Sequence, residues 1–171
     1  MPAGTFIAGV GEVERKFMVT YVNIGTHETP EWEALGVKIE DSSIEFNPDV
    51  ETITDILGIT TTTVNKTEPQ QSFEPHTIRK ESKFAQKIVK QVVVDKDLAA
   101  LSLYEVLIVY AFMGAAGAYD AELQTGCTIE PTSIGGSGRV DFPFNLHYSN
   151  KSTWGTVATL YPSAITFAPT P

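Results

Sequence analysis

The sequence contains a single cysteine, Cys127, so no intramolecular disulfide can form. A small secreted fold held together by disulfides is therefore excluded. Basic residues are also scarce, because 12 Lys and Arg stand against 21 Asp and Glu, for a formal net charge of −9. An acidic surface has few cations to displace the counterions condensed on a phosphate backbone, so ordinary DNA or RNA binding is disfavoured.

Sequence motifs of catalytic and cofactor sites are missing as well. The Gly-rich run 135–138 lacks the Lys-Ser/Thr pair of a phosphate loop and is followed by a predicted strand. The histidines His27, His76 and His147 lie in three different segments and form no recognised metal-ligand motif. We therefore predict that the protein is not an enzyme and has no cofactor and no metal site.

Only one hydrophobic run is long. Residues 98–119 are almost wholly apolar and could span a bilayer by length. However, Glu105 lies inside the run, and Gly114 and Gly117 interrupt it. Because a carboxylate in a membrane interior costs about 3 kcal/mol, we predict a core strand over residues 104–113, a turn after it, and no membrane partner.

The abundant residues favour β structure. A hydrophobic fraction of 42% and a charged fraction of 19% in 171 residues are typical of one globular domain, 1–171, rich here in Thr, Val, Ile and aromatic residues. Residues 1–15 read as a turn-prone lead-in and residues 162–171 as a Pro-rich, extended C-terminal arm. Besides the core strand, we expect strands over residues 16–24, 37–46, 50–64, 118–130, 139–148 and 156–161.

Three of these predicted strands carry irregularities. The alternation of residues 37–46 slips near Ser42, which predicts a bulge. Gly58 interrupts the strand over 50–64, whose threonines at 60–63 present hydroxyls on both faces, as in a sheet with one wet face or an arm that pairs with another chain. Residues 65–75 are polar and predict a mobile loop. Pro143 lies on the polar side of residues 139–148, which predicts a strand at a sheet edge or at an interface.

Residues 82–92 predict the one convincing helix. Ser82 is a suitable N-cap. Apolar residues then recur at helical spacing at positions 84, 85, 88, 89 and 92. The lysines at 83, 87 and 90 lie on the opposite side and are expected to form a solvated face.

The order of these segments resembles that of the major tail tube protein of long-tailed, siphovirus-like bacteriophages. The resemblance begins with Trp32 and the strand after Gly36, and continues with residues 43–48 and the strand from Val50 as a long hairpin. Residues 73–75 then precede the helix, and the core strand from Tyr104 follows it. The Gly-rich turn leads into the alternating strand, and the pattern ends at residues 155–157, so that it covers residues 30–160.

This resemblance implies a mostly β fold with one α-helix, built as a β-sandwich or rolled barrel. It implies a structural virion protein that forms stacked, hexameric rings, which make the tail tube through which phage DNA is delivered. The partners would be other copies of the chain, the tape measure, the tail tip and the terminator, while DNA would pass through the lumen without specific binding. The location would be the phage tail, after assembly in the bacterial host cytoplasm.

The resemblance also suggests two sets of site residues. Acidic side chains in the long hairpin would line the lumen or its approaches: Glu45, Asp49, Glu51 and Asp55. The loop that follows would contact an adjacent ring through Asn65, Lys66, Glu68, Gln70, Gln71 and Phe73.

Two other functions fit the same sequence. The first is another ring former of a tail, such as a tail terminator, a contractile-tail tube or a secretion-system tube. The second is a carbohydrate- or protein-binding β module, which would need exposed aromatic side chains such as Trp32, Tyr148 and Trp154 on one face.

Overall fold

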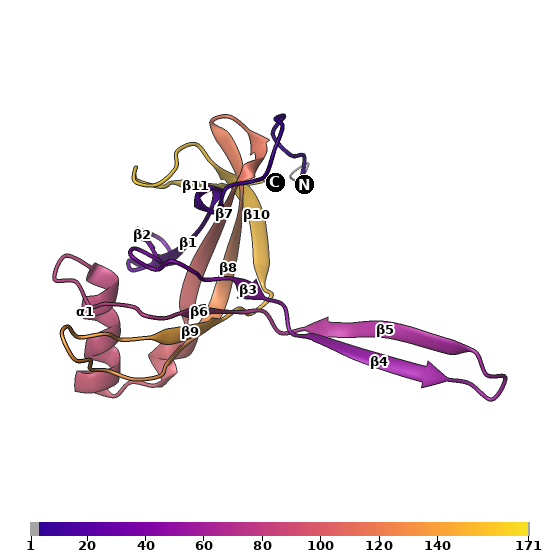
Figure 1. The fold of residues 1–171 in the computed structure, drawn as a ribbon. Helices are drawn as coiled ribbons and strands as arrows, with labels where there is room; N and C mark the ends of the chain where they lie inside the picture. The colour runs from indigo at the N-terminus through magenta and orange to yellow at the C-terminus, as the bar shows by residue number, and fades with distance from the viewer. Residues whose placement is uncertain (1–3, 171) are drawn as a thin grey trace.

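In the computed structural model, which describes residues 4–170, the chain forms a rolled antiparallel sheet, one α-helix and a projecting hairpin (Figure 1). The strands of the rolled sheet are β1 (Met18–Asn23), β2 (Trp32–Ala34), β3 (Ile44–Glu45), β6 (Gln70–Phe73), β7 (Tyr104–Ala115), β8 (Ala118–Pro131), β9 (Phe144–His147), β10 (Ser152–Val157) and β11 (Phe167–Pro169). The hairpin consists of β4 (Pro48–Thr54) and β5 (Thr60–Thr67). The predicted mostly β fold with one α-helix and a rolled sheet is confirmed.

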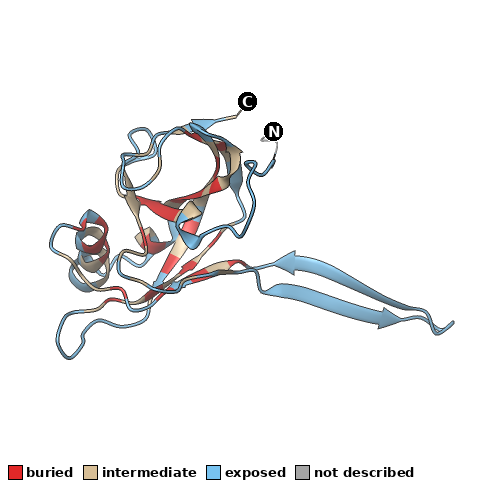
Figure 2. Ribbon diagram, turned by 45° about the horizontal axis from the view of Figure 1, so that its top comes forward, coloured by how far each residue is buried: buried red, intermediate tan, exposed pale blue. Residues whose placement is uncertain are grey.

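The sheet divides at strand β8. One path runs β2-β1-β7-β8-β9-β6-β3, while β10 pairs with β8 and β11 pairs with β10. Along β8, residues 119–124 pair with β10 and residues 128–131 pair with β9. Gly126 lies between the two pairings with φ of +70°, a conformation that costs glycine little. The division lets the sheet curl over its own core (Figure 2).

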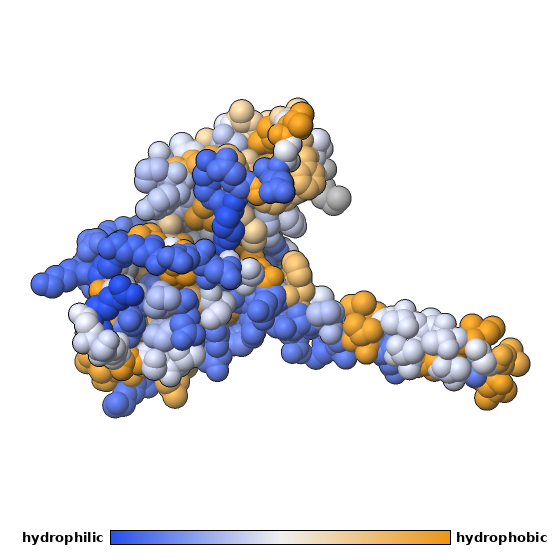
Figure 3. Space-filling model, viewed as in Figure 1, coloured by the Kyte–Doolittle hydropathy of each residue, from blue (hydrophilic) through white to orange (hydrophobic). Residues whose placement is uncertain are grey.

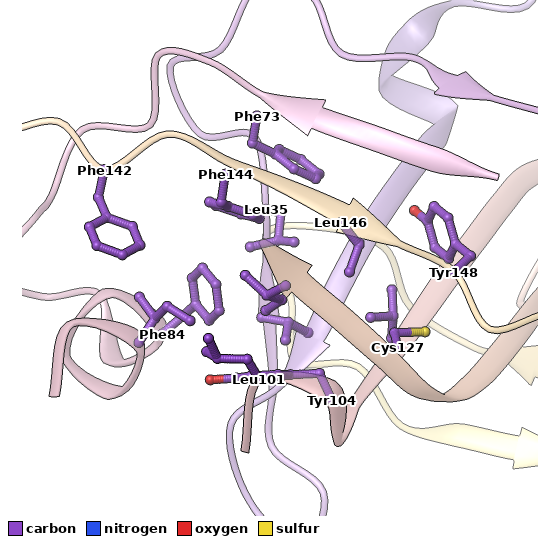
Figure 4. Close-up of a cluster of buried hydrophobic side chains, with 14 of the residues drawn as sticks. Leu35, Phe73, Phe84, Leu101, Tyr104, Cys127, Phe142, Phe144, Leu146 and Tyr148 are labelled. Atoms are coloured by element: carbon purple, nitrogen blue, oxygen red, sulfur yellow. The ribbon is translucent and has the colours of Figure 1, made fainter. Parts of the chain in front are cut away.

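The larger core lies between the sheet and the helical segment. Its buried side chains are Val22, Leu35, Phe73, Phe84, Ile88, Leu101, Tyr104, Val106, Ile108, Cys127, Ile129, Phe142, Phe144, Leu146 and Tyr148. Aromatic rings meet at its centre (Figure 4), where the Phe144 ring centroid lies 5.0 Å from Phe73 and 5.4 Å from Phe84. Such ring pairs stabilise a core beyond their buried area.

A second, smaller core lies on the other face of β1, β7 and β8. Tyr21, Leu107, Val109, Ala121 and Val157 are buried there. Side chains from the C-terminal segment, among them Leu160, Ile165 and Phe167, cover it. Because alternate residues of a strand point to opposite faces, β7 contributes to both cores, which explains why its sequence is almost continuously apolar.

The predicted helix is confirmed and is extended by an irregular turn. Helix α1 (Lys83–Val89) continues as the π-helical turn η2 (Lys90–Asp95). The Ser82 hydroxyl accepts a hydrogen bond from the Ala85 amide at 3.1 Å, as an N-cap does. Glu33 of β2 accepts a second one from the Phe84 amide at 2.9 Å, which ties the helix to the sheet.

The helix presents its apolar face to the larger core, as its periodicity predicts. Phe84, Ala85 and Ile88 are buried. The lysines on the other side are less uniformly solvated than expected. Lys83 pairs with Glu31, whereas the Lys87 ammonium lies 5.2 Å from the centre of the Tyr104 ring.

The predicted strands over 104–113 and 118–130 are confirmed as β7 and β8, which form a hairpin. Two glycines make its turn, since Gly114 and Gly117 have φ of +90° and +79°. Residues 98–103 include the short 3₁₀ helix η3 (Ala99–Ser102). No helix in the described part of the chain is long and apolar enough to cross a membrane.

The strand predicted over residues 37–46 is wrong except at β3. Gly36 and Lys38 have φ of +93° and +64°, which turn the chain away from extended structure. The Ile39 amide donates a hydrogen bond to the Gly36 carbonyl at 3.0 Å across this bend, and the chain is irregular until residue 43. The apparent slip near Ser42 therefore marks the end of a loop and is no bulge within a strand.

The loop predicted over residues 65–75 is also wrong. Asn65 and Lys66 continue β5, and Gln70, Gln71 and Phe73 form β6, which pairs with both β3 and β9. A buried polar cluster holds β6 in place: the Gln71 side-chain oxygen accepts hydrogen bonds from the Thr20 hydroxyl at 3.0 Å and the Tyr148 hydroxyl at 2.7 Å. Gln71 and Phe73 are each 1% exposed in this chain, and a contact of these two residues with an adjacent ring stays a prediction.

The strand predicted over residues 139–148 does not lie at a sheet edge, whereas a position at an interface stays a prediction. Strand β9 is shorter, Phe144–His147, and lies between β6 and β8. Pro143 precedes it, so it removes no ladder hydrogen bond. The alternation itself is confirmed from Phe142 to Tyr148, because the alternate residues there are buried.

The last predicted strand is displaced toward the N-terminus. Strand β10 ends at Val157, and residues 158–161 form a loop. Strand β11 then pairs Phe167 with Val157, which brings this part of the expected C-terminal arm back onto the sheet.

Candidate assembly surface

The hairpin of β4 and β5, residues 48–67, leaves the rolled sheet as an arm. It continues the pairing of β3 with β6, in which Glu45 lies opposite Gln70, and then extends into solvent (Figure 1). Every residue of both strands is exposed (Figure 2). At about 3.3 Å per residue, an arm of this length reaches about 25 Å from the body, far enough to contact a neighbouring molecule.

Hydrogen bonds fix the root of the arm. The Asn47 side-chain amide donates to the Glu68 carbonyl at 3.1 Å, and the Glu68 amide donates to the Phe46 carbonyl at 2.9 Å. The Asn150 side chain, from the loop before β10, donates to the Thr67 carbonyl at 3.1 Å. These contacts join the arm to two parts of the sheet, so its direction is set by the body.

The strands of the arm carry threonine on both faces. Thr52 and Thr62 share a hydrogen bond between hydroxyls at 3.1 Å, and Thr54 and Thr60 share one at 2.9 Å. These cross-strand pairs support the hairpin in water. The composition predicted a sheet with one wet face or an arm that pairs with another chain. The structure shows an exposed arm, and its pairing with another chain stays a prediction.

The tip of the arm is a tight turn built around Asp55. Its carboxylate accepts hydrogen bonds from the Leu57 amide at 2.8 Å and the Ile59 amide at 2.9 Å. Gly58 completes the turn with φ of +79°. The tip therefore has a defined backbone, although no other part of the chain contacts it in Figure 1.

Large apolar side chains gather at this tip. Ile56 is fully exposed, Leu57 is 78% exposed and Ile59 is 60% exposed. They form the apolar end of the arm in Figure 3, and Val50 and Val64, which are paired across the strands, form a second apolar patch nearer the body. Contiguous exposed apolar side chains mark protein or membrane contacts. The arm is the strongest candidate for an interaction surface.

The predicted acidic site residues are all exposed and follow the arm. Glu45 lies in β3 at its root, Asp49 and Glu51 lie in β4, and Asp55 lies at the tip. Glu51 accepts a hydrogen bond from the Asn65 side chain at 3.3 Å across the hairpin. The structure thus places these four residues along the arm and its root, and a lumen position for them stays a prediction.

The predicted ring-contact residues are divided by the structure. Asn65 and Lys66 belong to the arm, and Glu68 lies at its root beside Lys66, at 2.6 Å. This ion pair raises the pKa of Lys66 and lowers that of Glu68. Gln70 is half-buried in β6. A contact of these four residues with an adjacent ring stays a prediction.

Sequence reasoning missed the apolar tip. A signal was present, because Asp55 and Gly58 are turn residues placed between two runs of high β propensity. Reading them as a hairpin turn would have assigned Ile56 and Leu57 to an exposed tip.

The three aromatic side chains expected on a glycan-binding face, Trp32, Tyr148 and Trp154, do not form one exposed face in the structure. Tyr148 is buried in the larger core, and Trp32 packs against the smaller one. Trp154 is half-buried and stacks on Tyr110 with ring centroids 5.8 Å apart. Among residues 4–170, no group of three or more His, Cys, Asp or Glu side chains could hold a metal ion.

No protein-family model and no curated protein sequence matches the chain. Among solved structures, the chain is similar to the tube-terminating cap of the anti-feeding prophage, with a TM-score of 0.45 and 11% identity over 90% of this chain and 97% of the other. It is also similar to a chain of the sheath–tube complex of an extracellular contractile injection system in the extended state, with a TM-score of 0.45 and 8% identity over 85% of this chain and 93% of the other. Likenesses of this strength do not establish a function or an assembly state.

Proposed function

We propose that this chain is a structural subunit of a phage-type tail tube, in which copies associate into rings and the rings stack. The observation that carries the proposal is the exposed arm with its apolar tip. The sequence resemblance supplies the class of assembly, hexameric rings around a lumen through which DNA passes. The partners would be other copies, the tape measure, the tail tip and the terminator, in a phage tail assembled in the bacterial cytoplasm.

The physical case for assembly begins with the stability of the arm. A two-stranded hairpin that packs against nothing is marginal in water. Ile56 and Leu57 keep their apolar surface in solvent, which is unfavourable until another surface covers them. An arm with a fixed root and a preformed tip loses little conformational entropy when it binds. A second copy of the chain is the partner that a repeating tube provides.

The acidic residues support the same function in a second way. A wall that repels phosphate would let DNA slide without binding. Glu45, Asp49 and Glu51 are exposed and take part in no ion pair among the described residues, so we propose that they face the lumen or its approaches. Asp55 has a competing local role as the acceptor that closes the tip.

Negative-stain electron microscopy of concentrated protein, beside light scattering, tests this function. We expect hollow tubes with a regular axial repeat from the unmodified chain. The double variant Ile56→Asp with Leu57→Asp should remain monomeric, because charge at the tip opposes burial. The matched control is Val93→Asp with Val94→Asp, two neighbouring exposed aliphatic residues of η2, which should still assemble.

The outcomes separate the alternatives. Single rings without stacking would identify a terminator-like ring former. If the protein stays monomeric even with an initiating tail-tip fraction, the tube function is wrong. Glycan binding by that monomer would then support the binding-module function.

A further inference from the structure

The body of the protein carries a groove of about 630 Å³ next to strand β1. Its apolar lining consists of half-buried side chains from three segments that are distant in sequence: Phe17, Met18, Val19, Val37, Ile39 and Leu160. The buried side chain of Leu35 closes it from below. The groove therefore offers apolar surface that the chain itself leaves incompletely covered.

The rim of this groove is unusually basic for the chain. Arg15, Lys16 and Lys38 line it beside a single carboxylate, Glu40, in a protein with a net charge of −9. Lys16 pairs with Glu14 at 2.7 Å, so Arg15 and Lys38 are the cations that a partner's carboxylate would meet. Arg15 spans part of the rim by donating a hydrogen bond to the Ser42 carbonyl at 2.7 Å. Lys38 is exposed and has no ion pair among residues 4–170. An acidic and apolar partner would complement both the rim and the apolar lining.

The tip of the arm has this composition. It presents Ile56, Leu57 and Ile59 around the Asp55 carboxylate, and Glu51 adds a second negative charge along β4. The only cation of the arm, Lys66, lies at its root beside Glu68. The arm projects away from its own body (Figure 1), so its tip cannot reach the groove of the same molecule.

A neighbouring groove, of about 470 Å³, fits the tip less well. It lies at the root of the arm, where Phe46, Thr67 and Pro69 line it. Glu122 contributes a negative charge, and Arg15 is its only cationic lining residue. An acidic tip would meet no net positive charge there, whereas cations outnumber the one carboxylate that lines the first groove.

We propose that the groove lined by β1 and residues 34–40 receives the arm tip of a second copy of this chain. The inference rests on the proposed self-assembly and assigns its acceptor site: Ile56 and Leu57 contact the apolar lining while Asp55 approaches Lys38. Because each subunit carries one arm and one groove on different surfaces, the contact is head-to-tail and propagates from copy to copy.

Disulfide trapping between two populations of the full chain tests this contact. One population carries Leu57→Cys at the tip, and the other carries Val37→Cys in the groove together with a size tag. The native Cys127 is fully buried and does not compete. The matched control replaces Val37→Cys with Val93→Cys, an exposed valine outside the groove.

We expect the tagged heterodimer of the tip and groove variants to exceed that of the control pair by roughly tenfold or more, since docking raises the effective thiol concentration. Microscopy of the same samples separates the two proposals. Tubes without trapping above the control would mean that the arm docks elsewhere, so the groove assignment is wrong and the tube function stands. Trapping without tubes or rings would support the groove and contradict the tube. Absence of both would overturn both.

Discussion

Burial shifts the pKa of His76. Its ring lies among aromatic side chains, with centroids 5.1 Å from Phe144 and 5.9 Å from Phe84. Desolvation by burial lowers the pKa of His76 below its usual value, and the nearby Arg79 acts in the same direction. The unfolded chain therefore binds a proton at a higher pH than the folded chain does. The part of the unfolding free energy that depends on a neutral His76 is therefore fully present above the ordinary histidine pKa of about 6.5. This part is lost as the pH falls through and below that value.

We accordingly expect His76→Gln to lose less stability than the unmodified protein when the pH is lowered from about 7.5 to about 5.5. Urea unfolding at a series of pH values measures this difference directly. An unchanged pH dependence in His76→Gln would contradict the argument from burial.

Asp55 has two roles that substitutions can separate. Its carboxylate accepts hydrogen bonds from the amides of the tip, and it carries a negative charge. If the carboxylate acts by accepting the two amides of the tip, Asp55→Asn should keep most assembly, because its carbonyl oxygen still accepts, and Asp55→Ala should lose it. If assembly depends instead on the negative charge of Asp55, in the lumen or toward Lys38, both variants should lose assembly to the same extent. Tube yield by light scattering distinguishes the two results. Urea midpoints of both variants should stay close to that of the unmodified chain, because the tip contributes little to the body.

At the scale of elements, the arm and β7 are opposite extremes of the same fold. All residues of β4 and β5 are exposed, whereas most of β7 lies in one of the two cores. We expect arm amides in the monomer to exchange with solvent much faster than those of β7, because opening the arm exposes little new apolar surface. Hydrogen exchange followed by mass spectrometry measures both. On assembly, the amides of the arm should become protected from exchange, and those of β7 should change little. If the arm amides exchange as fast in tubes as in the monomer, the arm takes no part in the contacts between subunits.

The pairing of β10 with β11 depends on a close approach at Gly155. A methyl group at this position would collide with the Ala168 carbonyl and come within 2.6 Å of the Phe167 ring. Gly155→Ala should therefore push β11 from the smaller core and cost about 1–3 kcal/mol of unfolding free energy. Gly138→Ala is the matched control, since nothing lies within 4 Å of an added Cβ there. Equal urea midpoints for the two variants would show that β11 does not stabilise the body.

At the scale of the whole molecule, the two cores are coupled through a shared strand. Val106 and Ile108 of β7 face the larger core, and Leu107 and Val109 face the smaller one. Loss of either core would leave half of β7 exposed, so we expect the body to unfold in one cooperative transition. Tryptophan fluorescence, which reports Trp32 beside the smaller core and Trp154 stacked on Tyr110, should coincide with far-UV circular dichroism during urea unfolding. Two separated transitions would show that the halves of the sheet are independent.

Local patterns in the sequence predicted the elements whose formation depends on neighbouring residues. The helix after Ser82 was predictable because its cap and its apolar stripe lie within three turns. The strands β7 and β8 were predictable because long apolar runs separated by glycines have few other structures in a soluble domain. Composition similarly indicated the mostly β fold and the solvated threonines of the arm.

Only the tertiary structure decided which strands pair and which leave the sheet. Residues 37–46 alternate like a strand, yet positive φ at Gly36 and Lys38 turns them into a loop that lines the groove. Gln71 is polar and was expected in a mobile loop, but long-range hydrogen bonds to Thr20 and Tyr148 make it part of the core. Likewise, the groove joins β1 to residues that follow β10. Such contacts depend on residues far apart in the chain, so local periodicity and propensity cannot encode them.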